Sequence, residues 1–185
     1  LVAANMSDNT YLFNFDNETG KVTNFNNSSN PRRLSLSGGD GYGVEFSPSS
    51  ERLYISTGDF YGNTAENLYQ FDLSFPTFSE INSSRSTIYS YFNSRSALQL
   101  GPDGKIYWSS EFSNSISVIN NPNEIGKDNV NYSHRSVDLG GAQASQGLPP
   151  FISSLLLPLE IKDSDTDQLI NNKNLEFCIG DNKTI

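Results

Sequence analysis

The sequence predicts an all-β fold, on the evidence of its composition, its alternating apolar residues and an internal repeat. The 185 residues include 12 Phe, 9 Tyr and 14 Gly but only one Met. Aromatic residues favour strands, and glycine favours the tight turns that join them. A chain of this length buries one sizeable core, so we expect one main domain and a tail that belongs to another.

Two segments, residues 43–56 and 97–109, repeat one pattern of strand, turn and strand. The copies align at Pro48 and Pro102, about 50 residues apart. In the second copy Asp103-Gly104 provides the positive-φ residues that a short hairpin turn requires. Both segments therefore predict antiparallel hairpins.

A further strand is predicted after each hairpin, at residues 67–72 and 115–120, and residues 10–16 match the same strand. Repeats of about 50 residues with several strands each are typical of the four-stranded blades of a β-propeller. The spacing predicts these units: a partial blade near residues 1–38, full blades near 39–93 and 94–140, and a last inner strand near 147–157. Three to four blades do not close a ring, so we expect other residues to complete it.

The domain prediction assigns residues 1–158 to the blades of this incomplete propeller. Residues 159–174 are predicted to be a linker, because residues 160–167 are polar and charged. Alternation resumes at residues 175–181, and residues 175–185 are predicted to form the first strand of a following β-sandwich.

Six motifs occur in order along the chain, at residues 41–48, 53–56, 68–73, 97–107, 117–123 and 146–152. Together they resemble the propeller region of large Bacteroidetes surface proteins that end in a gliding-motility-associated C-terminal domain. The resemblance covers about residues 1–157 and implies secretion by the type IX system to the cell surface. It also implies immunoglobulin-like or PKD-like modules after the propeller, which the strand predicted at 175–185 fits, and it carries no catalytic residues.

The formal net charge of −9 disfavours binding to nucleic acid or to an anionic membrane. We expect no membrane insertion, because the apolar run at residues 151–159 is short and contains Pro158. The chain starts at Leu1 without a signal peptide, so a targeting segment is expected upstream. A single cysteine, Cys178, leaves open a disulfide with a residue beyond Ile185.

His134 is the only histidine, with Ser133 and Asp138 close to it in sequence. A hydrolase needs a histidine beside both a nucleophile and an orienting carboxylate. Closeness along a strand does not build such a triad, and one histidine does not supply a zinc site. We therefore predict no catalytic, cofactor-binding or metal-binding residue, and we expect His134 in a solvent-facing loop or at a blade edge.

The acidic run at Asp163, Asp165 and Asp167 has two interpretations, a solvated linker or a weak calcium site. It departs from an EF-hand loop, because Gln168 stands at its sixth position and Asn174 at its twelfth. The linker is the preferred interpretation.

The glycine-dense segment at residues 38–43 is predicted to be a turn that enters an innermost strand, where glycine lets backbones approach closely. Several aromatic residues are predicted in or near loops, where they pack between blades or stack on a ligand. They are Phe60, Tyr61, Tyr89, Tyr91, Phe92 and Phe112.

These observations favour a non-catalytic module for adhesion, or for binding a protein or a polysaccharide. Its expected partners are the remaining blades and downstream domains of the same polypeptide, and a surface polysaccharide or the secretion or motility machinery. One alternative is a secreted glycan lyase or hydrolase whose catalytic residues lie in blades outside this chain. Another is a cargo protein captured with a secretion or motility complex.

Overall fold

The computed structural model describes residues 1–5, 9–37, 39–58, 65–92, 95–109 and 111–148, and the backbone at 161–162 and 169–170. The chain divides into two compact units, Leu1–Phe151 and Ile152–Ile185. In the described part of the second unit, β13 (Ile161–Lys162) pairs antiparallel with β14 (Leu169–Ile170). These strands lie within the range predicted to be a linker, and the strand predicted over 175–185 lies outside the described residues.

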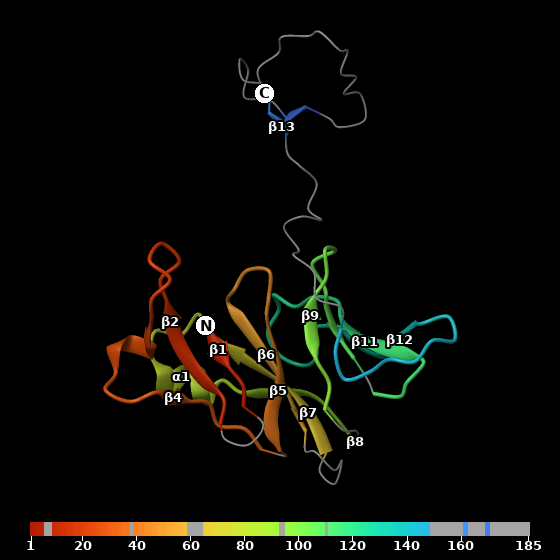
Figure 1. The fold of residues 1–185 in the computed structure, drawn as a ribbon, viewed down its shortest axis with the longest axis horizontal. Helices are drawn as coiled ribbons and strands as arrows, with labels where there is room; N and C mark the ends of the chain where they lie inside the picture. The colour runs from red at the N-terminus through yellow and green to blue at the C-terminus, as the bar shows by residue number, and fades with distance from the viewer. Residues whose placement is uncertain are drawn as a thin grey trace. The chain divides into compact units, whose positions relative to one another are not determined.

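The first unit is built of three consecutive antiparallel sheets, and its middle sheet has the longest strands (Figure 1). This sheet contains β5 (Asp40–Phe46), β6 (Arg52–Gly58), β7 (Ala65–Asp72) and β8 (Ser86–Phe92) in sequential order. Between β7 and β8 lies α1 (Phe78–Ser83), which begins at a capping box of Thr77 and Glu80.

The third sheet repeats this order with β9 (Leu98–Leu100), β10 (Ile106–Trp108), β11 (Ser115–Ile119) and β12 (Tyr132–Asp138). Both predicted hairpins are thus confirmed, as β5–β6 and β9–β10, and each is followed by the predicted further strand. The last inner strand, predicted near 147–157, falls mostly outside the described residues.

The first sheet is built around β2 (Tyr11–Phe15), the strand predicted at residues 10–16. β1 (Val2–Ala3) pairs with one edge of β2, while β3 (Val22–Asn24) and β4 (Arg32–Arg33) share the other edge. A short 3-10 turn, η1 (Phe25–Asn27), follows β3.

The middle sheet is covered on both faces, because neighbouring residues of β6 and β7 point in opposite directions. Leu53, Ile55, Tyr69 and Phe71 belong to one buried cluster with Leu12, Leu34 and other residues of the first sheet. Tyr54 and Leu68 belong to a second cluster with Ile106, Trp108 and Ile119 of the third sheet. All seven residues of β6 are buried as a result.

The hairpin turns show why the two copies of the repeat align. Gly104 has the predicted positive φ, 76°, whereas the prediction of a positive φ at Asp103 is wrong. The Gly104 backbone nitrogen donates to the Gly101 oxygen at 3.1 Å. Ser50 takes the equivalent place in the first copy with a φ of 60°, and its nitrogen donates to the Ser47 oxygen at 2.8 Å. A serine thus adopts here a left-handed conformation that glycine adopts at lower cost.

The glycine-dense segment enters β5 as predicted, and Gly43 shows why a side chain is excluded there. A β-carbon at this position would lie 2.7 Å from the Ser96 oxygen and 2.8 Å from the Leu98 nitrogen. The first strand of the middle sheet therefore touches the backbone that enters the first strand of the third sheet. Gly38 lies outside the described residues.

A buried polar group also joins the middle and third sheets. The Gln70 amide of β7 donates to the Glu124 oxygen at 2.7 Å and accepts from the Gly126 nitrogen at 2.8 Å. It also donates to the Tyr54 hydroxyl at 2.7 Å, which in turn donates to the Pro122 oxygen at 2.9 Å. Burial raises the pKa of Tyr54 to about 12, so this hydroxyl keeps its proton at neutral pH. The loop between β11 and β12 is thereby held on the middle sheet.

Candidate functional site

The histidine considered as a catalytic candidate lies on β12, and its hydrogen bonds are not those of a triad. Its Nδ1 atom lies 3.0 Å from the Tyr132 hydroxyl and 3.4 Å from the Ser117 hydroxyl. The Ser133 hydroxyl instead accepts from Asn120, and the Asp138 carboxylate accepts from the Gly140 nitrogen. The three residues that are close in sequence are therefore not assembled into one site.

A bulge in β12 determines where the His134 side chain lies. Val118 pairs with Ser133 and Ile116 pairs with Val137, so three residues of β12 lie opposite Ser117. Arg135, inside the bulge, has a φ of 47°, and its backbone nitrogen donates to the Ser117 hydroxyl at 3.0 Å. Bulges re-aim side chains in this way.

Because of the bulge, the successive residues His134 and Arg135 both contact the ring of Tyr91. The His134 ring centroid lies 5.0 Å from that of Tyr91, and the Arg135 guanidinium carbon lies 4.8 Å from it. In a regular strand these two side chains would point to opposite faces. The guanidinium over the tyrosine ring is a cation–π contact.

His134 is part of an aromatic cluster between β8 of the middle sheet and β12 of the third. Its ring stacks on Tyr89 with centroids 4.7 Å apart and an interplanar angle of 27°. Tyr89 also lies 4.7 Å from Tyr132 and meets the edge of Trp108 at 6.5 Å. The structure thus brings together Tyr89, Tyr91 and His134, which the sequence presented as separate candidates.

Tyr89 lies inside β8 and Tyr91 lies next to its last residue, so the predicted loop location is wrong for Tyr89. Both rings pack between two sheets, which is one of the two roles predicted for these aromatic residues. They alternate with the exposed Ser90, as residues on one face of a strand do, and that face meets the third sheet. Phe92 ends the same strand, and Phe60 and Tyr61 lie outside the described residues.

The electrostatics of the cluster favour neutral side chains. Burial and the positive charge of Arg135 lower the pKa of His134 below its ordinary value. Burial raises the pKa of Tyr132, so its hydroxyl keeps its proton beside the His134 Nδ1 atom. Ser117 is fully buried and therefore is not a nucleophile that a substrate reaches. This cluster therefore combines hydrogen bonds within the third sheet with ring stacking between the middle and third sheets.

We expect the chain to lose stability as the pH falls from 7.5 to 5.5, partly through His134. A histidine whose folded pKa is depressed contributes stability above its unfolded pKa of about 6.5 and loses it as the pH falls through the folded pKa. Protonation would also place a second cation beside Arg135, among Tyr89, Tyr91 and Tyr132. Urea unfolding at both pH values measures the loss. His134→Phe, which keeps the stacking but does not titrate, is expected to reduce it, and an unchanged loss in this variant would contradict the assignment.

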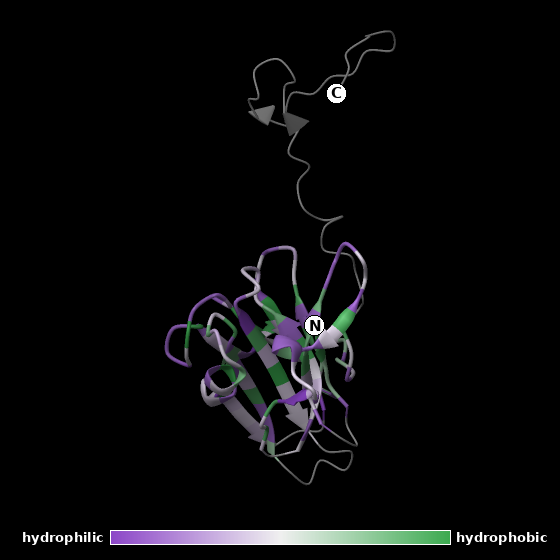
Figure 2. Cartoon of the chain, turned by 90° about the vertical axis from the view of Figure 1, so that its left-hand side faces the viewer, coloured by the Kyte–Doolittle hydropathy of each residue, from purple (hydrophilic) through white to green (hydrophobic). Residues whose placement is uncertain are grey.

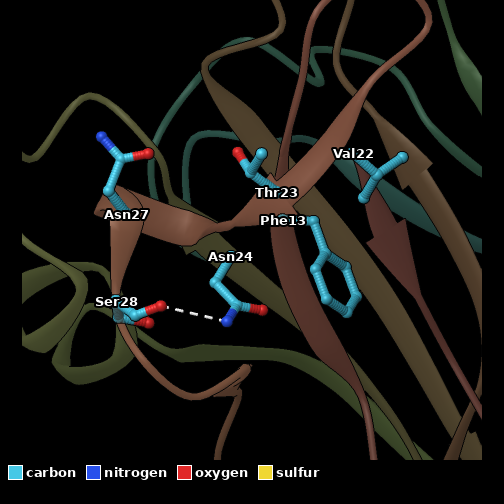
Figure 3. Close-up of a pocket in the computed structure, with 6 residues that line it drawn as sticks. All are labelled: Phe13, Val22, Thr23, Asn24, Asn27 and Ser28. Atoms are coloured by element: carbon cyan, nitrogen blue, oxygen red, sulfur yellow. Dashed lines mark hydrogen bonds between the residues drawn. The ribbon is translucent and has the colours of Figure 1, made fainter.

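An open hollow of about 480 Å³ lies on the first sheet, against β3 and the turn that follows it (Figure 3). Phe13, Val22, Thr23, Asn24, Asn27 and Ser28 line it. The Asn24 amide donates to the Ser28 oxygen at 3.0 Å, and none of the lining residues is charged. Sequence reasoning did not single out this surface, because the alternation in residues 10–16 does not indicate which face of the strand is covered.

Phe112 is the most exposed of the large apolar residues that the structure describes, with 75% of its surface accessible. It lies between β10 and β11 with a φ of 59°, a conformation rarely adopted by a bulky residue. Its backbone nitrogen donates to the Ala144 oxygen at 3.0 Å, which anchors the loop. A fixed backbone thus holds an aromatic ring in solvent, as expected for a residue in a predicted loop.

Within the described ranges, no group of three or more His, Cys, Asp or Glu side chains is placed to hold a metal ion. Asp163, Asp165, Asp167 and Cys178 lie outside those ranges, so the two interpretations of the acidic run remain. Of the helices described, none has the length and apolar character needed to cross a membrane. Neither a protein-family model nor a curated protein matches this chain.

Proposed function

We propose that the three sheets are consecutive blades of a larger β-propeller, which serves as a non-catalytic binding module of a secreted cell-surface protein. The observation that carries the fold proposal is the complete burial of β6, because the middle sheet meets the first sheet with one face and the third with the other. A ring of blades covers each sheet in this way.

The position of the first strands also supports a propeller. β5 lies beside β9, and at Gly43 the backbone that enters β9 leaves no room for a β-carbon. First strands crowd together near the axis of a propeller, where glycine is the residue that allows close approach.

Two observations support a binding role over a catalytic one: Phe112 is exposed, and His134 is already engaged by contacts within the protein. An exposed aromatic ring on an anchored loop stacks well on a sugar ring, and loops on a rigid scaffold commonly carry binding residues. The histidine, in contrast, is occupied by a hydrogen bond within its own strand and by stacking on Tyr89 of the middle sheet. We propose a polysaccharide of the cell surface as the ligand, with adhesion or gliding as the result.

Replacing Phe112 by alanine in the complete protein is expected to weaken polysaccharide binding about tenfold, the effect of losing one aromatic stacking contact. A glycan array followed by titration with the polysaccharide that binds provides the measurement. Phe75→Ala is the matched control, because Phe75 is 41% exposed in the turn after β7 and is not expected to contact the ligand.

Equal binding by both variants would contradict the role of Phe112, and absence of binding to any surface polymer or envelope protein would contradict the proposed function. Release of soluble sugar products would instead favour the glycan-active enzyme.

A further inference from the structure

We infer that a further four-stranded antiparallel sheet of the same repeat packs against the outer face of the first sheet. This inference rests on the propeller proposed above and identifies which surface receives the next blade. This outer face is formed by Phe13 and Phe15 of β2, Val22 of β3 and Leu1, the residue before β1.

The first argument is the equivalence of β2 and β7. Residues 11–16 and 67–72 both carry apolar residues at their second, third and fifth positions and end in aspartate. In β7, Leu68 packs toward the third sheet, while Tyr69 and Phe71 pack toward the first. The third and fifth positions of this strand therefore face the preceding sheet.

The same rule holds for the third sheet and predicts the orientation of β2. Ile119, at the fifth position of the matching segment in β11, faces the middle sheet and is fully buried. In β2, Leu12 faces the middle sheet, so Phe13 and Phe15 face away from it. They occupy the positions that Tyr69 and Phe71 use to contact a preceding sheet.

The exposed fractions of equivalent residues show that no sheet covers the outer face of the first sheet within the part of the chain that the structure describes. Tyr69 and Phe71 are 2% and 0% exposed, whereas Phe15 is 54% exposed. Leu1 and Val22 are 50% and 47% exposed, so the apolar surface extends beyond one side chain. Such joined apolar surfaces commonly mark interaction sites.

The exposed residues form one face across neighbouring strands. Val22 is the direct cross-strand partner of Phe15, and Leu1 exchanges two backbone hydrogen bonds with Phe13, of 2.9 and 3.1 Å. Figure 2 views the molecule from the side where Figure 1 places the first sheet, and hydrophobic and hydrophilic bands alternate along the strands. The hollow against β3 forms part of this face.

The two interfaces within the chain indicate the chemistry of the occupant. Tyr69 and Phe71 meet a surface that includes Leu12 and Leu34, and Ile119 meets one that includes Leu68. The occupant should therefore present an aliphatic residue at the position of Leu12 and Leu68 in its own third strand. Because the hollow has no charged lining, we expect an uncharged contact surface.

The test places p-benzoylphenylalanine at position 15 of the complete protein and irradiates it. We expect a cross-link to a peptide with an alternating strand pattern and an aliphatic residue at the predicted position. The same substitution at Phe75, which is also exposed but lies in a turn, is the control and should not link to that peptide.

A cross-link to a glycan, a cross-link to residues 1–185 of a second copy, or no cross-link at position 15 would each overturn the inference. These outcomes are separate from the proposed binding function. Polysaccharide binding that still depends on Phe112, without the position-15 cross-link, would support the binding role and contradict only the packing of a further sheet on this face.

Discussion

Replacing Arg52 by alanine is expected to lower the free energy of unfolding by about 3–5 kcal/mol. The Arg52 guanidinium donates to the Asp72 carboxylate at 2.7 Å, and the two side chains are only 9% and 11% exposed. Asp72 also accepts hydrogen bonds from the nitrogen and hydroxyl of Ser74. Without Arg52 the carboxylate would remain buried without its opposite charge, which costs more than the intact pair contributes.

Urea unfolding measures this loss, and a double-mutant cycle with Asp72→Ala isolates the interaction between the two charges. Lys105→Ala is the surface control, because Lys105 and Asp103 lie 3.8 Å apart with both side chains 42% exposed. Its effect should stay below about 0.5 kcal/mol. If the Arg52 variant lost no more stability than the Lys105 variant, the ion pair would not stabilise the pairing of β6 with β7.

Phe71→Ala is expected to cost about 3–5 kcal/mol, because it removes a fully buried ring and leaves a cavity. The ring packs in the cluster between the first and middle sheets. The equivalent change Phe15→Ala, in the 185-residue chain, is expected to cost less than about 1 kcal/mol, since the ring is 54% exposed.

Urea or thermal unfolding of the two variants compares equivalent positions of one repeat under identical conditions. Similar losses for both would show that the Phe15 ring is covered within this chain and would contradict the orientation assigned to β2. A small loss for Phe71→Ala would contradict the burial between the first two sheets.

The repeating part of the fold could be predicted because local signals and spacing agree. Pro48 and Pro102 mark turns, Gly104 has the positive φ that its sequence suggested, and the strands around both turns pair as expected. Ser50 carries no such signal, yet the hairpin around it forms, because burial of β6 on both faces outweighs the cost of one left-handed serine.

The arrangement around His134 could not be predicted, because it depends on a bulge and on contacts between sheets. Nothing in the order Ser133, His134, Arg135 indicates that Arg135 adopts a φ of 47°. Tyr89 and Tyr91 lie more than 40 positions before His134 in the sequence, and only packing of β8 against β12 brings them together. Local patterns do not contain this information.

The outer face of the first sheet could not be predicted, for a different reason. Residues 10–16 match the other two strands, but the side toward which Phe13 and Phe15 point follows only from the packing of Leu12 against the middle sheet. Alternation predicts that two faces exist and does not identify which one is covered.

The hydrogen bonds of Gln70 and Tyr54 have a consequence for how the unit denatures. Repeat proteins whose neighbours touch weakly come apart one unit at a time, whereas strong coupling between neighbours makes them melt together. Here the loop that follows β11 cannot leave without unpairing the buried Gln70 amide, so the middle and third sheets should behave as one cooperative block.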